Sequence, residues 1–252
     1  MAVLVVPYHQ DKRLIDGCVP LPSTGDVRVL EPELPEGDIW QRLAALDDAV
    51  ADEVAAALGE GGPVAVLSGD CLVAMGVLAG AQRAGLRPGV IWFDAHGDVH
   101  TLETTTSGYL GGLSLRLLLG AHPGLLAEPL GVEPVTEDRT VLVDARDLDP
   151  PEERYLRTSM IRRGHVADVA YASLPEGPLI VHVDVDVADP GELPGLLMPS
   201  LGGPSAAQVV AAVDRIRETG RIGVLSVACT WHPTGRDDVR RAREELLRGL
   251  LG

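Results

Sequence analysis

Residues 90–98 read Val-Ile-Trp-Phe-Asp-Ala-His-Gly-Asp, an apolar run that ends in a cluster of polar side chains. Residues 179–186 have the same construction, because Leu-Ile-Val-His-Val is followed by Asp-Val-Asp. Near-continuous apolar runs are typical of parallel strands that are covered on both faces. In open α/β sheets the functional residues gather at the carboxyl ends of the strands. The two stretches therefore predict an α/β fold with a site at one edge of its sheet.

The rest of the chain alternates between segments typical of strands and of helices. Further strands are expected at residues 3–6, 63–67, 140–143 and 223–227, with weaker candidates at 26–29 and 165–169. Apolar residues step by three and four from Leu43 to Leu58, after a capping box formed by Asp38 and Gln41. Similar signals predict helices over residues 205–220 and 237–250. This alternation implies a parallel sheet with helices on both sides, in one domain over residues 1–252.

Composition excludes several classes of protein. The formal net charge of −16 argues against a nucleic-acid partner, which would need clustered Lys and Arg. The three cysteines are too few and too scattered for a disulfide framework. We find neither a basic leader nor an apolar run of the roughly 18 residues that a membrane span requires. We therefore expect a cytoplasmic protein that does not act on membranes.

The polar clusters at the two strand ends have the composition of a metal site. Alternate residues of an extended segment point the same way, so Asp94, His96 and Asp98 are expected to project together. The same holds for Asp184 and Asp186. Carboxylates and imidazole suit divalent cations of the manganese or zinc type. So many like charges can share a pocket only if a cation neutralises them. The sequence therefore predicts a metal site.

Several motifs resemble, in order, those of the arginase/agmatinase ureohydrolase family. They are Ser-Gly-Asp-Cys at 68–71, residues 92–98, a Thr-rich loop at 101–108, Arg-Asp-Leu-Asp-Pro at 146–150, and residues 182–190 with the loop that follows. The resemblance runs from about Val64 to Pro233. It implies a three-layer α/β/α sandwich on a central, mostly parallel sheet of about eight strands, an arginase-like fold.

The resemblance also implies a reaction. The expected ligands of two Mn²⁺ are Asp94, His96, Asp98, Asp184 and Asp186, with Asp98 also assigned a catalytic role, and Cys71 stands at a further ligand position. A hydroxide held between the metals would attack a non-peptide carbon–nitrogen centre of a small guanidino, amidine or amide compound, because metals lower the pKa of bound water towards about 7. The implied substrate contacts are Thr101, Ser107, Tyr109, Asp147, Asp149 and Thr230. Family members commonly form trimers or hexamers, so a homo-oligomer is also implied.

Cys71 departs from the family pattern, which has a metal-binding His at this position. Thiolate is a poor ligand for Mn²⁺ but an acceptable one for Zn²⁺. The site would then hold either two Mn²⁺ or a single Mn²⁺ or Zn²⁺. The alternative is that Cys71 is only a small buried residue at the start of a helix.

Two further departures concern the substrate. The family's proton-shuttling His falls on Gly111, which cannot transfer a proton, so His100 or Tyr109 is expected to take that role. The family's guanidinium-binding Glu is missing from Thr-Trp-His-Pro at 230–233. Asp237 or Asp238 could compensate only if the following loop folds back.

These departures leave two classes of function open. A further change, Leu-Leu-Met at 196–198, makes one wall of the site apolar unless those residues are buried in the core or at a subunit contact. The leading interpretation is a metal-dependent hydrolase with weak or absent activity on arginine. The alternative is a non-catalytic or mononuclear relative that keeps the fold for binding or assembly.

Overall fold

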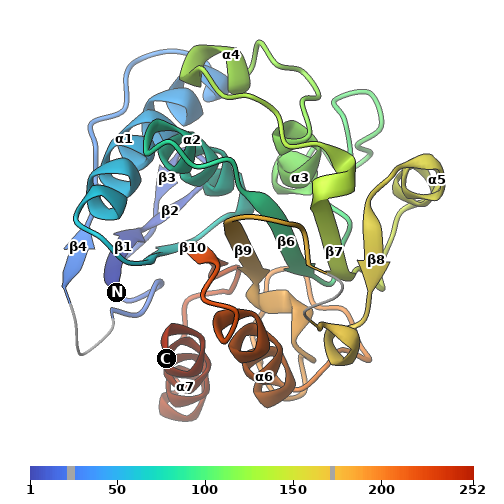
Figure 1. Cartoon of the computed structure of the whole chain (residues 1–252). Coiled ribbons are helices and arrows are strands. Elements are labelled where there is room, and N and C mark those ends of the chain that lie inside the picture. Colours follow the sequence, from blue (N-terminus) through green and yellow to red (C-terminus); the bar gives the residue numbers. More distant parts are fainter. Residues whose placement is uncertain (22–25, 171–173) are drawn as a thin grey trace.

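The computed structural model describes residues 1–21, 26–170 and 174–252, and its centre is a parallel sheet of eight strands (Figure 1). The strand order is β4-β1-β5-β10-β9-β6-β7-β8, and each neighbouring pair is parallel. The strands are β1 (Ala2–Val6), β4 (Val27–Val29), β5 (Val64–Ser68), β6 (Gly89–Asp94), β7 (Thr140–Asp144), β8 (Arg162–Gly164), β9 (Leu179–Asp184) and β10 (Ile222–Ala228). A short antiparallel pair, β2 (Tyr8–His9) and β3 (Lys12–Arg13), follows β1.

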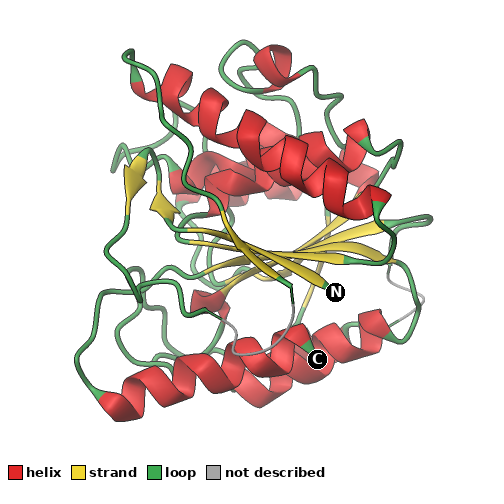
Figure 2. Ribbon diagram, turned by 90° about the vertical axis from the view of Figure 1, so that its left-hand side faces the viewer, coloured by secondary structure: helices red, strands yellow, loops and turns green. Residues whose placement is uncertain are grey.

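Helices cover both faces of the sheet, as Figure 2 shows. Residues of α1 (Ile39–Gly59), α2 (Ala74–Arg83), α3 (Ser114–Leu118) and α4 (Ala127–Leu130) contribute to one core. Residues of α6 (Ala206–Arg217) and α7 (Asp237–Leu251) contribute to the other, and α5 (Pro150–Thr158) lies beside β8 at the edge (Figure 1). The expected three-layer sandwich is confirmed.

The central strands are apolar on both sides because each side faces a core. In β6, Val90 and Trp92 belong to the core under α1 and α2, whereas Ile91 and Phe93 belong to the core under α6 and α7. Alternate side chains of a strand point to opposite faces, so a doubly covered strand must be apolar throughout. The predicted capping boxes at the start of α1 and α6 are both present.

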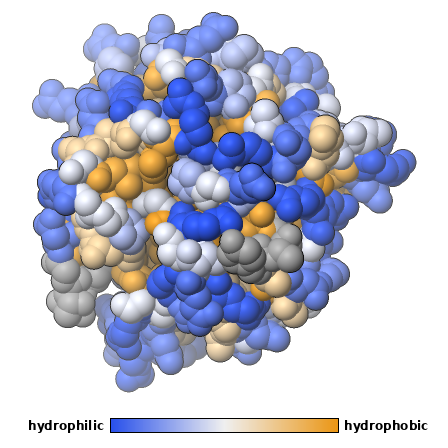
Figure 3. Space-filling view, viewed as in Figure 1, coloured by the Kyte–Doolittle hydropathy of each residue, from blue (hydrophilic) through white to orange (hydrophobic). Residues whose placement is uncertain are grey.

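One face of the molecule is mainly polar. Hydrophilic side chains cover most of the face shown in Figure 3, with a smaller apolar area over the side where α1 and α2 lie. Among the described residues, no helix is long and apolar enough to cross a membrane.

The strand expected at residues 165–169 is wrong. Val166–Asp168 form a short 3-10 helix instead, closed by the bond from the Asp168 amide to the His165 carbonyl at 2.9 Å. The strand lies just before, at β8, whose Arg-Arg-Gly sequence has no apolar signal. Strand β8 is at the edge of the sheet and pairs on one side only. Its two arginines are exposed, so the strand does not need the apolar residues that a buried strand has.

Candidate metal centre

The candidate ligands come from neighbouring strand ends. Asp94 and Asp184 are the last residues of β6 and β9, which pair directly with each other. Cys71 begins the 3-10 helix η1 (Cys71–Val73) after β5, and Thr230 follows β10. Because all these strands are parallel, their carboxyl ends meet at one edge of the sheet. There the six candidate ligands line a single cavity.

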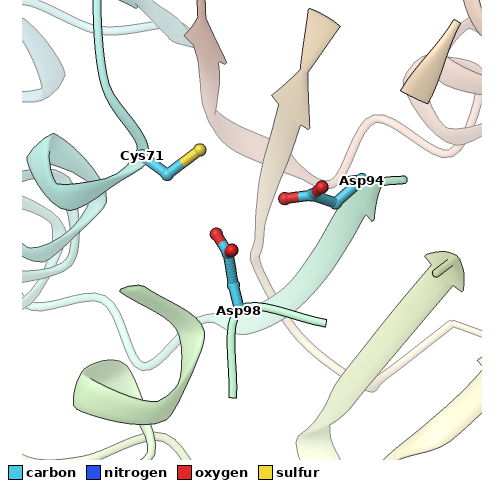
Figure 4. A group of neighbouring side chains, drawn as sticks. All are labelled: Cys71, Asp94 and Asp98. Atoms are coloured by element: carbon cyan, nitrogen blue, oxygen red, sulfur yellow. The ribbon is translucent and has the colours of Figure 1, made fainter. Parts of the chain in front are cut away.

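The ligand atoms form two groups that share Asp94. Atoms of Cys71, Asp94 and Asp98 lie within 4.8 Å of one another, and so do atoms of Asp94, His96 and Asp186. Figure 4 shows the first group, whose three side chains converge on one space from two stretches of the chain, the start of η1 and the residues at and just after the end of β6. Asp184 lies beside it, with its Oδ2 atom 2.9 Å from the Sγ atom of Cys71. Each group could hold a divalent cation.

The ligands meet for a different reason from the one the sequence suggested. The strands end at Asp94 and Asp184, so the residues that follow are not extended. Instead, the chain turns sharply, and the Asp94 carboxylate accepts a bond from the His96 amide at 2.7 Å. Asp98 has a φ of 53°, in the left-handed region, and Asp186 lies in the 3-10 helix η6 (Val185–Val187). The expectation that these side chains gather is correct, but the extended-segment argument for it is wrong.

The carboxylates of this cluster outnumber the positively charged side chains that line the cavity with them. Burial and the neighbouring Asp94 raise the pKa of Asp186 to about 7, and burial raises that of Asp98 and Asp184 as well. Burial opposes the charge on His96, but bonds to Asp186 and Asp94 outweigh it and raise its pKa to about 12. The Oδ2 atom of Asp98 is buried with no hydrogen-bond partner. Clustered carboxylates, an imidazole and an unpaired buried oxygen fit a divalent cation.

The Asp94 carboxylate is held in place by a stacked pair of aromatic rings, Trp92 and His182. The indole nitrogen of Trp92 donates to its Oδ2 atom at 3.1 Å. The Trp92 ring stacks on His182 at 3.7 Å between centroids, and Nδ1 of His182 lies 3.0 Å from the hydroxyl of Ser226. Complete burial lowers the pKa of His182 to about 3, so this ring is neutral near pH 7. The stack therefore holds the shared carboxylate in position.

The space that a side chain at position 111 would need is filled by Tyr109. A Cβ atom on Gly111 would lie 2.5 Å from Cε1 of the Tyr109 ring. The Tyr109 hydroxyl donates to Asp70 at 3.3 Å, and the ring lines the cavity. His100 also lines the cavity and is buried, with its Nε2 atom 3.1 Å from the Asp149 carboxylate. Both proposed replacements for the missing His are therefore at the site.

Most of the predicted substrate contacts line the same cavity. Ser107, Asp147, Asp149 and Thr230 all do so. Thr101 is not among the lining residues, and its hydroxyl points to that of Thr104 at 3.4 Å.

The last motif supplies a hydroxyl where the family has a carboxylate. The Thr230 hydroxyl donates to the Asp184 carboxylate, which orients that candidate ligand. Asp237 and Asp238 do not replace the missing Glu. Both are exposed in the first turn of α7 and pair with Arg240 and Arg236.

The apolar wall predicted at residues 196–198 divides between two environments. Leu196 is buried in the core, whereas Met198 is partly exposed and lines the cavity.

Two residues at the site carry roles that we did not assign from the sequence. Glu152 is buried, lines the cavity and accepts bonds from the amides of Val99 and Asp149 at 3.2 and 3.1 Å. Its spacing from Asp149 is that of a capping box, a pattern that predicts the contact with the Asp149 amide. The Arg146 guanidinium binds the Asp144 carboxylate and the carbonyls of Val187 and Ser200. It thereby fixes the loop after η6, and no local pattern indicates that role.

Comparison with known proteins gives a consistent result. The model of the arginase family matches residues 17–230. An arginase from Bacillus subtilis is 29% identical over 231 residues, which cover 85% of this chain and 78% of the relative. An arginase from Bacillus caldovelox is 35% identical over 168 residues, 61% of this chain and 56% of the relative. The solved structure of the Bacillus caldovelox arginase superposes with a TM-score of 0.79 at 25% identity, covering 100% of this chain and 97% of that one.

Proposed function

The chain belongs to the arginase family, and from that premise we propose that it is a metal-dependent hydrolase of a non-peptide carbon–nitrogen bond in a small molecule. The observation that carries the proposal is the pair of ligand groups that share Asp94. Within the first group, the Oδ2 atom of Asp98 is buried and has no hydrogen-bond partner. A purely structural metal does not need ligands that line an open cavity.

Different side chains of the cavity are proposed to bind the metal ions and to transfer protons during hydrolysis. Asp94, His96 and Asp186 would hold one divalent cation, and Cys71, Asp98 and Asp184 would complete a second position beside it. A bound cation supplies Lewis acidity, which makes water nucleophilic near neutral pH. Asp98 is proposed to take a proton from the attacking water.

His100 is proposed as the group that passes a proton to the leaving nitrogen. Its imidazole lies in the cavity wall, with Nε2 against Asp149 at 3.1 Å and Nδ1 against the Thr104 hydroxyl at 3.1 Å. These two contacts orient the ring. The Tyr109 hydroxyl is the second polar group on this wall and is proposed to position the substrate.

The charge of the cavity wall favours an amine over an acid at the far end of the substrate. Among the described residues that line the cavity, seven are Asp or Glu and none is Lys or Arg. Asp147 and Asp149 are exposed at the mouth, where they suit an amino group. Among the described residues of this lining, a substrate carboxylate at the mouth would find no Lys or Arg to pair with. The cavity of about 280 Å³ suits a small molecule.

The reacting end of the substrate is expected to be less basic than a guanidinium. Thr230 stands where the family's carboxylate would pair with a guanidinium, and an unpaired charge in a buried site is strongly unfavourable. Met198 makes the same wall partly apolar. We therefore propose an amine-bearing amide, whose reacting end is uncharged, as the favoured substrate class, with weak or no turnover of arginine.

A non-catalytic or mononuclear relative is the second candidate. Cys71 in place of a ligand His and Gly111 in place of the shuttle His are the observations that favour it. Assembly as a trimer or hexamer and a cytoplasmic location stay predictions.

The test is a hydrolysis panel on the metal-loaded protein. Purified chain would be loaded with Mn²⁺ or Zn²⁺ and assayed for release of urea or ammonia from arginine, agmatine, guanidino acids and amine-bearing amidines and amides. We expect turnover of at least one amine-bearing amide, and weak or no turnover of arginine, by the native protein and by Asp168→Asn, an exposed control outside the cavity. Asp94→Asn should be inactive. Turnover that survives in Asp94→Asn, or no turnover of any compound by fully loaded protein, would overturn the proposal.

A further inference from the structure

The two halves of the metal centre differ in their donor atoms, and only one contains sulfur. The first group offers the thiol of Cys71 with two carboxylates, whereas the second offers the imidazole of His96 with two carboxylates. From this we infer that the centre is a mixed-metal site, which takes a thiophilic cation of the Zn²⁺ class at Cys71 and an oxygen-preferring cation such as Mn²⁺ at His96. The inference rests on the proposed function, because it concerns the same centre.

Cys71 is held so that its sulfur faces the other ligands. Its side chain points into the space shared with Asp94 and Asp98 (Figure 4), and its Sγ atom lies 2.9 Å from Asp184 Oδ2. The residue starts η1, and the carboxylate of Asp70 caps that helix by accepting from the Leu72 amide at 2.9 Å. Cys71 is only 4% exposed. The sulfur is therefore a fixed member of the cluster and not a surface thiol.

Asp98 provides independent support for a ligand at this position. The residue is 6% exposed, and its Oδ2 atom has no hydrogen-bond partner. Leaving a buried polar atom unpaired is unfavourable, and more so for a charged group. An unpaired buried oxygen is expected where a bound ion, and not the protein, supplies the missing contact.

Ligand chemistry then separates the two halves. Binding at the first group forms a metal–sulfur bond and releases the thiol proton to solvent, and the resulting thiolate is a soft ligand that favours Zn²⁺ and disfavours Mn²⁺. The second group has only nitrogen and oxygen donors, which both cations accept. Zn²⁺ binds most sites more tightly than Mn²⁺, so the discriminating quantity is the ratio of the two affinities at each half.

Cobalt spectroscopy tests the metal–sulfur bond without an activity assay. Co²⁺ would be titrated into the metal-free full chain, and the thiolate-to-cobalt charge-transfer band followed in the near ultraviolet. The native chain and Cys18→Ser should develop this band, saturating at one equivalent. Cys18 is a matched control, because it is equally buried at 4% exposed but does not line the cavity. Cys71→Ser should bind Co²⁺ without the band.

Metal competition tests the mixed occupancy. With one equivalent of Zn²⁺ and an excess of Mn²⁺, the native chain should retain one zinc and one manganese per chain after dialysis. In Cys71→Ser the affinity of this position for Zn²⁺ relative to Mn²⁺ should fall by roughly tenfold or more, the scale of affinity losses seen even for outer-sphere changes. If Cys71→Ser does not fold, Cys71→His serves in its place and should bind two Mn²⁺ with no band.

The outcomes separate this inference from the proposed function. No charge-transfer band in the folded native chain, or an equal band in Cys71→Ser, would overturn the mixed-metal site even if the protein hydrolyses its substrate. A band without any hydrolysis would uphold the mixed-metal site and count against the enzyme.

Discussion

Gly111 offers a direct test of how the cavity is filled, because a side chain there would collide with Tyr109. In Gly111→Ala the new Cβ atom would lie 2.5 Å from Cε1, 2.7 Å from Cζ and 2.8 Å from the hydroxyl oxygen of Tyr109. The ring cannot swing aside freely, since its hydroxyl bonds to Asp70 at 3.3 Å and its face stacks on His9 at 5.8 Å between centroids. The substitution must therefore displace the ring.

The expected cost is that of an overpacked site, about 1–3 kcal/mol in the free energy of unfolding. For a chain of this length that corresponds to a melting temperature roughly 2–12 °C lower. Gly112→Ala is the matched control, because its Cβ atom would meet only the His100 ring, at an ordinary 3.7 Å. Its unfolding free energy should fall by less than about 1 kcal/mol.

The assay is a double-mutant cycle with Tyr109→Ala, measured by urea unfolding of the metal-free proteins. Removing the ring should relieve the clash, so Gly111→Ala should cost about 1–3 kcal/mol less in the Tyr109→Ala background than in the native one. An equal cost in both backgrounds would refute the reasoning, because it would mean that the ring does not occupy this space.

Three further predictions concern the charges around the centre. Mn²⁺ or Zn²⁺ at 100 times its Kd should stabilise the native chain by about 2.7 kcal/mol, read as a higher melting temperature, and should leave Asp94→Asn unchanged. The pKa of Asp186 is raised to about 7, so the folded metal-free chain binds more protons than the unfolded chain between about pH 4 and 7. The free energy of unfolding of the metal-free chain should therefore fall as the pH rises through that range, and added metal should abolish this fall. If the free energy of unfolding of the metal-free native chain instead rises with pH, and more steeply than that of Asp186→Asn, the assignment is contradicted. Arg146→Ala should destabilise by about 2–4 kcal/mol in urea unfolding, because it leaves the Asp144 carboxylate and several carbonyls unpaired. Replacing the exposed Arg157 by Ala should change the free energy of unfolding by less than about 0.5 kcal/mol. Similar losses in both variants would count against a stabilising role for the contacts of Arg146.

The parallel sheet and the place of the site could be predicted because burial on both faces leaves a continuous apolar run in the sequence. The polar residue that ends such a run, Asp94 or Asp184, then marks the edge where the strands meet. The edge strand β8 could not be predicted, since its Arg-Arg-Gly sequence is not buried on both sides and follows no pattern.

The finer arrangement of the site depends on contacts that no local sequence pattern records. The left-handed φ of Asp98 is set by the turn after β6 and not by strand alternation. Tyr109 fills the space over Gly111 through contacts with His9 and Asp70, which lie far away in the chain. Arg146 reaches carbonyls about forty to fifty-five residues further along. These features follow from the packed structure, whereas the ligand types follow from the motifs.

The most direct test of the central claim is anomalous diffraction from crystals of the full chain grown with Zn²⁺ and Mn²⁺. Data collected on both sides of the zinc absorption edge would locate each metal. The account predicts a zinc peak among Cys71, Asp94 and Asp98 and a manganese peak beside His96 and Asp186. Ordered side chains at these positions with no anomalous peak in either place would contradict it.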